Sequence, residues 1–274
     1  MSLPQHTDAQ LRFDQQVENS RHFVIPFIEK EFAILPALRI MEIGCGEGGV
    51  LYPFLEKGCE VVGIDLEASR ILLAQNFLHD FIGKGRVRLI AKNIYDLDFL
   101  GEFRHYFDLI LLKDAIEHIP NQEKLIGYLG ELLGAGGKIF FGFPPWYMPL
   151  GGHQQICQHQ VLSMFPFLHL LPAALYKKIL QAGGEDQGTI KELLEIKSTG
   201  ISIERFEKIL TRQHYAIRFK QFFLINPIYK YKFGLQPRKQ LRVISAIPFI
   251  RNFLTTCVYY LVEKEDLFLK IQSS

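Results

Sequence analysis

The sequence predicts an α/β protein built on a mostly parallel sheet with helices on both faces. Two observations lead to this prediction. Short apolar segments alternate with helical segments through the first half of the chain, and these apolar segments lack the polar alternation of half-exposed strands. Strands that are buried on both faces in this rhythm are typical of a parallel sheet. The 274 residues fit one domain with a sizeable insertion.

The elements follow one another in a regular order. An amphipathic helix is expected over residues 19–33, behind an Asn/Ser cap. Five strands are expected over residues 37–43, 59–65, 86–92, 106–112 and 137–143. The intervening helices are expected from about Val50, over 67–81 and over 121–133, with Gly134 as the stop of the last one.

The rhythm breaks after Pro144-Pro145. Residues 144–200 contain helical, aromatic and Gly-rich pieces without strand alternation. A helix behind a serine cap is expected over 202–213, and two further strands over 214–225 and 255–264. The 144–200 segment is therefore predicted to be an insertion over the carboxyl edge of the strands, where ligands bind in such sheets.

Composition sets the class of protein. Apolar residues make up 48% and charged residues 22%, as in ordinary globular proteins. The cysteines (Cys45, Cys59, Cys157 and Cys257) are far apart and form no CxxC motif, which excludes a zinc ribbon and fits a reducing compartment. The polar first residues predict no signal peptide, and the most apolar window, 161–180, is too interrupted for a transmembrane span. We therefore expect a cytoplasmic protein.

A glycine turn follows the first strand. Gly44, Gly46 and Gly49 formally satisfy GxGxxG, which alone indicates a dinucleotide only weakly and leaves a nicotinamide-dependent oxidoreductase as an alternative. Glu42 would repel a pyrophosphate there but would attract a cationic amine. Asp65 ends the second strand, where an acid can accept hydrogen bonds from a ribose diol. S-adenosylmethionine offers an ammonium, a sulfonium and a ribose diol, and no phosphate.

These residues carry a family resemblance. Residues 42–48 (EIGCGEG), Asp65 and residues 107–119 (FDLILLKDAIEHI) resemble class I S-adenosylmethionine-dependent methyltransferases, with partial similarity to ubiquinone-pathway O-methyltransferases. The resemblance covers about residues 35–145 and, more loosely, the last two strands. It implies a Rossmann-like seven-stranded sheet of 3-2-1-4-5-7-6 type whose last strand is antiparallel. The expected organisation is one domain over 1–274, with a helical cap at 1–35 and an acceptor-binding lid at 144–200.

The resemblance also implies roles for single residues. Glu42, Gly44, Cys45 and Gly46 would line the methionyl and ribose part of the cofactor, Asp65 would hold the ribose hydroxyls, and Leu66 would pack on adenine. Asn93 and Ile94 stand where the family often has an acid for the adenine amino group, and the Asn93 oxygen can still accept that hydrogen bond. Lys113 replaces a small or polar residue, and its charge would oppose a sulfonium unless it points away.

The DAIEH run, residues 114–118, allows three interpretations. The preferred one is structural: Glu117 and His118 support the loop under the cofactor. In the second, His118 or His153 is a general base for an acceptor hydroxyl. In the third, Asp114, Glu117, His118 and His153 hold a metal, as in metal-dependent O-methyltransferases. We expect no metal and activity that survives chelation; convergence of Glu117, His118 and His153 on one point would favour the third interpretation.

Two further segments bear on the acceptor. Trp146, Tyr147 and Met148 are expected either to form a hydrophobic lid near the methyl group or to belong to a small core of the insertion. Between Lys208 and Val262 the sequence has ten basic residues and no acid, whereas residues 1–207 sum to −7. The basic 208–251 stretch indicates contact with an anionic surface, or simply solvated strand faces that are balanced by acidic neighbours.

The sequence thus predicts transfer of a methyl group from S-adenosylmethionine to a small or lipid-linked acceptor, most readily at oxygen, with S-adenosylhomocysteine as product. Methyl transfer needs little besides alignment and exclusion of water, so an acid-rich rim is no proof of acid–base catalysis. No nucleic-acid partner is expected. An RNA-directed methyltransferase remains the alternative that the basic stretch leaves open.

Overall fold

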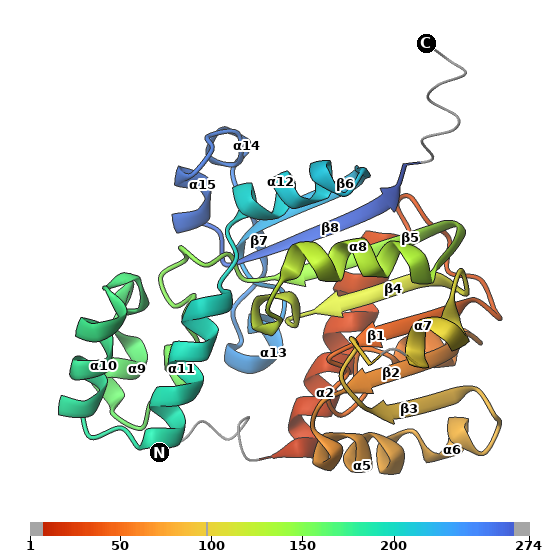
Figure 1. The fold of residues 1–274 in the computed structure, drawn as a ribbon, viewed down its shortest axis with the longest axis horizontal. Helices are drawn as coiled ribbons and strands as arrows, with labels where there is room; N and C mark the ends of the chain where they lie inside the picture. Colours follow the sequence, from red (N-terminus) through yellow and green to blue (C-terminus); the bar gives the residue numbers. More distant parts are fainter. Residues whose placement is uncertain (1–7, 97, 266–274) are drawn as a thin grey trace.

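The computed structural model describes residues 8–96 and 98–265, which form one eight-stranded mixed sheet with helices on both faces (Figure 1). The strand order is β3-β2-β1-β4-β5-β8-β6-β7. The strands are β1 (Arg39–Ile43), β2 (Glu60–Asp65), β3 (Val87–Ala91), β4 (Phe107–Lys113), β5 (Leu133–Phe143), β6 (Tyr215–Ile225), β7 (Arg238–Lys239) and β8 (Cys257–Lys264). All seven expected strands are present, with boundaries shifted by a few residues.

The predicted seven-stranded sheet is wrong in number, and its strand order gains an eighth member at the β6 edge. The pair Arg238–Lys239 adds an eighth strand by pairing with Phe223 and Ile225 of β6. A two-residue strand has no periodicity that a sequence pattern could reveal. The first five strands pair in parallel, and β8 runs antiparallel to both β5 and β6.

Two groups of helices cover the two faces of the sheet. On one face, α2 (Ala9–Asn19), α3 (Ile25–Ile28), α4 (Tyr52–Glu56) and α5 (Ala68–Phe77) contribute to a core with β1, β2, β4, β5 and β8, and α6 (His79–Ile82) follows α5. On the other face, α7 (Asp98–Phe103), α8 (Gln122–Leu132) and α12 (Ile203–Arg212) pack against the same strands. Ser202 caps α12 by accepting a hydrogen bond from the Arg205 N–H, as the sequence predicted.

Two predicted helix ends are wrong. The first helix begins at Ala9 instead of residue 19, because the Asp8 side chain caps it by accepting a hydrogen bond from the Leu11 N–H at 3.0 Å. It continues through a π-helical turn, Ser20–Val24, into α3, and residues 1–7 of the expected cap lie outside the described residues. Gly134 does not stop α8, since Leu133 is already extended and pairs with Phe107.

The insertion contains α9 (Gln160–Met164), α10 (Ala173–Ala182) and α11 (Gln187–Thr199), and it lies beside the carboxyl ends of the parallel strands (Figure 1). It has a small core of its own, formed by Cys157, Leu168, Tyr176, Leu180, Ile190 and Leu193. The short helices α13 (Tyr229–Phe233), α14 (Arg242–Ser245) and α15 (Ile250–Phe253) follow β6. Over residues 8–96 and 98–265, no helix has the length and hydropathy needed to cross a membrane.

Candidate functional site

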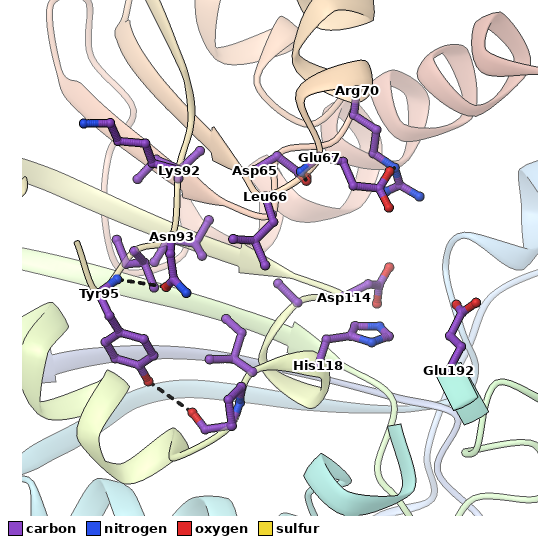
Figure 2. A pocket seen from close by; sticks show the side chains of 17 residues that line it. Asp65, Leu66, Glu67, Arg70, Lys92, Asn93, Tyr95, Asp114, His118 and Glu192 are labelled. Carbon is purple, nitrogen blue, oxygen red and sulfur yellow. Dashed lines mark hydrogen bonds and ion pairs between the residues drawn. The ribbon is translucent and has the colours of Figure 1, made fainter. Parts of the chain in front are cut away.

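Two cavities open where the parallel strands end. The larger, of about 380 Å³, is lined by residues that follow β1, β2, β3 and β4 (Figure 2). The smaller, of about 140 Å³, lies over the glycine turn and is also lined by Phe13 and Gln16 of α2. Gly44, Arg70 and Asp114 line both, so the two cavities are neighbours on either side of the same backbone.

All nine residues predicted to bind the cofactor line one of these cavities. Gly44, Asp65, Leu66, Asn93 and Ile94 line the larger one, and Glu42, Gly44, Cys45, Gly46 and Lys113 line the smaller one. Residues that are up to about 70 positions apart meet here because parallel strands end at the same edge of the sheet. Which ligand each residue contacts stays a prediction.

The glycine turn is held in its shape by Asp65. Gly44 and Gly46 have φ values of +73° and +52°, which an L side chain rarely adopts. A Cβ on Gly44 would also lie 3.0 Å from the Ala115 Cβ. The Asp65 carboxylate accepts hydrogen bonds from the Gly46 N–H at 2.8 Å and from the Glu67 N–H at 2.9 Å. Asp65 therefore orders the turn, a role that the sequence reasoning missed, and retains lone pairs for a ligand.

Glu42 is a buried carboxylate with unsatisfied bonding capacity. Its side chain is 1% exposed, and burial raises its pKa well above the usual value although the Lys113 charge opposes this. Its Oε2 has no hydrogen-bond partner among the described residues. Because a buried acceptor without a partner is costly, this atom favours a ligand with a hydrogen-bond donor or a positive charge in the smaller cavity.

Part of the wall of the larger cavity is apolar. Leu66 is 72% exposed and lies next to Asn93 and Asp65 at the cavity wall (Figure 2). The Asn93 Oδ1 accepts a hydrogen bond from the Tyr95 N–H at 3.0 Å, and the Tyr95 hydroxyl donates to the Pro120 carbonyl at 3.1 Å. The amide oxygen of Asn93 can accept one more bond, since it has two lone pairs.

Buried Lys113 forms an ion pair with the partly exposed Asp114. The Lys113 side chain has no exposed surface, and its Nζ donates to the Asp114 carboxylate. Burial lowers the pKa of Lys113, but the charge and hydrogen bond of Asp114, together with Tyr259 and Cys257, outweigh it and raise that pKa above its usual range. The Lys113 charge is thus matched by its neighbour, so the predicted conflict with a sulfonium is removed by pairing.

Glu117, His118 and His153 converge on one point at the rim. The Nε2 atoms of His118 and His153 each lie 3.9 Å from the Glu117 Oε1, and the two imidazole rings have centroids 4.8 Å apart. One ligand atom from each of the three residues falls within 4.8 Å of the others. Asp114, the fourth residue of the metal interpretation, is bonded to Lys113 instead.

Burial determines the protonation states of this cluster. Burial, with help from Asp114, raises the pKa of Glu117 to about 8, so without a cation this carboxyl keeps its proton near pH 7, and neither of its oxygens has a hydrogen-bond partner among the described residues. Burial and the neighbouring His118 lower the pKa of His153 to about 4, so its ring is neutral near pH 7. Two imidazoles and a carboxyl that gives up its proton on metal binding form a donor set that fits a divalent cation.

Sequence reasoning missed several residues of the site. Arg70 of α5 and Glu192 of α11 line the larger cavity, and Glu192 comes from the insertion (Figure 2). Trp146, Tyr147 and Met148 are absent from the lining of both cavities. No local sequence motif predicts that Arg70 or Glu192 lines the cavity, because the packing of its helix brings each of them there.

Comparison with known proteins supplies independent information. A protein-family model described as a methyltransferase domain matches residues 41–139. A ubiquinone biosynthesis O-methyltransferase from Bradyrhizobium sp. (strain ORS 278) is 32% identical over 110 residues, 40% of this chain and 41% of that protein. One from Coxiella burnetii (strain Dugway 5J108-111) is 30% identical over 118 residues, 43% of this chain and 47% of that protein. The match thus spans less than half the length of either curated relative.

The fold extends further than the sequence similarity. A solved structure of geranyl diphosphate methyltransferase in complex with S-adenosylmethionine superimposes with a TM-score of 0.56 at 12% identity. The superposition covers 91% of this chain and 85% of that one. At this identity the likeness establishes the fold and leaves the acceptor open.

Proposed function

We propose that this chain, which carries a class I S-adenosylmethionine-dependent methyltransferase domain at residues 41–139, methylates a hydroxyl oxygen of a small or lipid-linked acceptor with the help of a divalent cation. The observation that carries the cation is the convergence of Glu117, His118 and His153 beside the cofactor cavities. Oxygen as the acceptor atom is supported by the names of the relatives, which are O-methyltransferases.

The chemistry of the cavities supports S-adenosylmethionine as the cofactor they hold. The buried Glu42 carboxylate fits the methionyl ammonium, and a pyrophosphate would be repelled there. The free lone pairs of Asp65 suit a ribose diol, and exposed Leu66 suits one face of adenine. Bound in this way, the cofactor presents a methyl group on a positively charged sulfur. The oxidoreductase alternative has only the glycine pattern in its favour.

The cation is supported by the donor set at the rim. Glu117 would supply a carboxylate oxygen, and His118 and His153 would each supply Nε2, which already lies 3.9 Å from that oxygen. A divalent cation supplies Lewis-acid chemistry, which lowers the pKa of a bound hydroxyl group. His118 lines the larger cavity, which supports a cation next to the proposed cofactor site. The geometry thereby favours the third interpretation of the DAIEH run over the structural one that the sequence favoured.

The surrounding residues keep this cluster in place. The Asp114 N–H donates to the Gly142 carbonyl at 2.7 Å, which ties the turn before Glu117 to β5. The Thr199 hydroxyl, at the end of α11, donates to the Glu117 carbonyl at 2.6 Å. The insertion is thus hydrogen-bonded to the turn that carries Glu117 and His118, two of the proposed metal-binding residues. We propose that residues 144–200 act as the acceptor lid and that the described part of residues 1–35 closes the smaller cavity through Phe13 and Gln16.

Calorimetry on the full chain tests the cofactor assignment. We expect S-adenosylhomocysteine to bind and NAD to give no signal. Glu42→Gln should weaken S-adenosylhomocysteine binding about tenfold, because a charge-assisted bond contributes roughly 1.5 kcal/mol or more. Glu56→Gln, a solvent-exposed acid far from the cavities, is the matched control. Binding of NAD alone would overturn the proposal.

Removal of metal by a chelator distinguishes the three interpretations of residues 114–118: structural support, a general base and a metal site. We expect EDTA to abolish methyl transfer and Mg²⁺, Mn²⁺ or Zn²⁺ to restore it, with His153→Ala reducing metal affinity at least about tenfold. His79→Ala, on the surface of α6, should change neither. Activity that survives EDTA but is lost in His118→Ala would identify a base instead, and survival of both treatments would support the purely structural interpretation.

The acceptor itself requires a screen. Labelled S-adenosylmethionine should be incubated with the protein and, separately, with lipid extract, aqueous metabolite extract and RNA from the producing cell. We expect the label in the lipid or the metabolite fraction, as an alkali-stable ether. Label in RNA alone would replace this proposal by the RNA-directed alternative.

A further inference from the structure

The basic stretch divides into a paired part and an unpaired part. Four of its ten cations form ion pairs: Arg212 with Glu123, Arg218 with Glu263, Lys220 with Glu207, and Arg251 with Glu204 and Glu207. These four cations therefore fit the expectation that the basic residues lie on solvated strand faces and are balanced by acidic neighbours. By contrast, Arg238, Lys239 and Arg242 are exposed, and none of the described carboxylates pairs with them.

Large exposed apolar side chains share this segment of the chain with the unpaired cations. Leu241 and Val243 flank Arg242 in sequence and are 64% and 75% exposed. Leu235, Ile247, Phe249, Ile250 and Leu254 are exposed as well. Together with Arg238, Lys239 and Arg242 they form what we term the α14–α15 surface. Isolated exposed apolar side chains are ordinary, but a cluster of this kind on one segment indicates an interaction surface.

Phe249 is held in solvent by a specific set of bonds. Its φ of +64° is rare for a bulky residue and persists only where the surroundings impose it. Glu204 of α12 imposes it by accepting hydrogen bonds from the Phe249 N–H at 2.9 Å, from Arg251 Nε at 2.9 Å and from Asn252 Nδ2 at 2.5 Å. Three hydrogen bonds to one carboxylate thus hold the loop in a conformation that presents an aromatic ring outward.

The surface continues onto the insertion. The Phe253 ring contacts Tyr147 and Phe167, with centroid distances of 5.6 Å and 6.0 Å. Beyond Phe167, the insertion exposes Val161, Met164 and Phe165. In Figure 1, α14 and α15 lie on the same side of the molecule as α9 and α10, the side toward which the parallel strands point.

We propose that the α14–α15 surface, continued by residues 161–167, seats this protein on an anionic lipid bilayer. Aliphatic side chains that enter the headgroup region, flanked by cations that face lipid phosphates, are the features of interfacial attachment without a transmembrane span. A nucleic acid would use the cations but has no place for exposed Leu, Val and Ile. A bilayer matches both the apolar and the charged halves of the surface.

Vesicle flotation with the full chain tests this proposal without reference to methyl transfer. We expect binding to vesicles of phosphatidylcholine mixed with phosphatidylglycerol, and weaker binding to phosphatidylcholine alone. Reversing the three charges (Arg238→Glu, Lys239→Glu, Arg242→Glu) should lower binding about a hundredfold or more. The matched control reverses three cations elsewhere on the surface (Lys57→Glu, Lys84→Glu, Arg104→Glu) and should bind as the unmodified protein does.

A second variant tests the apolar half. Val243→Asn with Phe249→Asn should lower binding about tenfold or more, whereas Leu72→Asn, an exposed leucine of α5, should not. Circular dichroism and binding of S-adenosylhomocysteine establish that each variant is folded. Absence of vesicle binding, or equal binding by all variants, overturns the proposal. Loss of RNA binding in the charge-reversed protein with unchanged vesicle binding also overturns it and assigns the cations to nucleic acid.

Discussion

The cofactor edge of the sheet and the chain after Phe143 are built in different ways. At the cofactor edge four of the residues that line the larger cavity come within two positions of the end of a strand: Gly44 follows β1, Leu66 follows β2, Asn93 follows β3 and Asp114 follows β4. After Phe143, the chain is joined to the rim of the sheet by contacts between segments far apart in sequence, such as the hydrogen bond from the Thr199 hydroxyl to the Glu117 carbonyl. The family match ends at residue 139, close to this change.

Recognition of the cofactor and recognition of the acceptor depend on different features of the chain. A parallel sheet brings its carboxyl ends together whatever the loops contain, so a cofactor site needs only short motifs at the strand ends. The proposed acceptor site, made from an insertion and a C-terminal segment, would need long-range polar contacts to fix its parts. The family match at residues 41–139 covers the first kind of site, whereas the insertion and the C-terminal segment lie outside it.

The largest effect is expected when the cofactor edge loses Asp65. Asp65→Ala removes the acceptor for the Gly46 and Glu67 N–H groups and for a ligand diol. Two charge-assisted hydrogen bonds contribute roughly 3 kcal/mol, so calorimetry should show S-adenosylhomocysteine affinity reduced about a hundredfold. Asp80→Ala, an exposed acid on α6, is the control. Affinity within about threefold of the unmodified protein would mean that the turn holds its shape without Asp65.

The same contrast explains what could be predicted from the sequence. The nine residues predicted to bind the cofactor all line the two cavities because motif and strand end coincide, and α12 was predicted correctly because Ser202 precedes an amphipathic repeat. The first helix was misplaced because Asn19-Ser20 looked like a cap although Asn19 is helical and fully buried. The convergence of His153 with Glu117 could only be raised as a question, since a separation of 36 residues leaves the relative position open.

A smaller effect is expected from the contacts that fix α15. Glu207 accepts hydrogen bonds from Lys220 at 2.7 Å, from Arg251 at 2.8 Å and from the Tyr260 hydroxyl at 2.8 Å. Glu207→Gln removes the charge that these donors share, so urea unfolding near pH 7 should show a loss of about 2 kcal/mol. Glu195→Gln, an exposed acid on α11, should cost less than about 0.5 kcal/mol.

The pH dependence of this effect has a definite sign. Burial would raise the pKa of Glu207, but hydrogen bonds from Lys220 and Arg251 outweigh it and lower the pKa below its usual 4.5. A carboxyl with a lowered pKa in the folded state contributes stability above its usual pKa and loses it as the pH falls through the folded value. The difference between Glu207→Gln and the unmodified protein should therefore shrink at pH values below 4.5. A difference that grows in acid would contradict the assignment.

The smallest effect is expected where the insertion meets the turn that carries Glu117. Thr199→Val keeps the shape of the side chain but removes the hydroxyl that donates to the Glu117 carbonyl at 2.6 Å. One neutral hydrogen bond contributes about 1 kcal/mol, so kcat should fall about fivefold while the affinity for S-adenosylhomocysteine stays unchanged, because Thr199 lines neither cavity. Thr189→Val, whose hydroxyl bonds only within its own helix cap, is the matched control. If Thr199→Val instead weakened cofactor binding as much as turnover, the two regions would act as one site, and the separation between cofactor edge and acceptor region would fail.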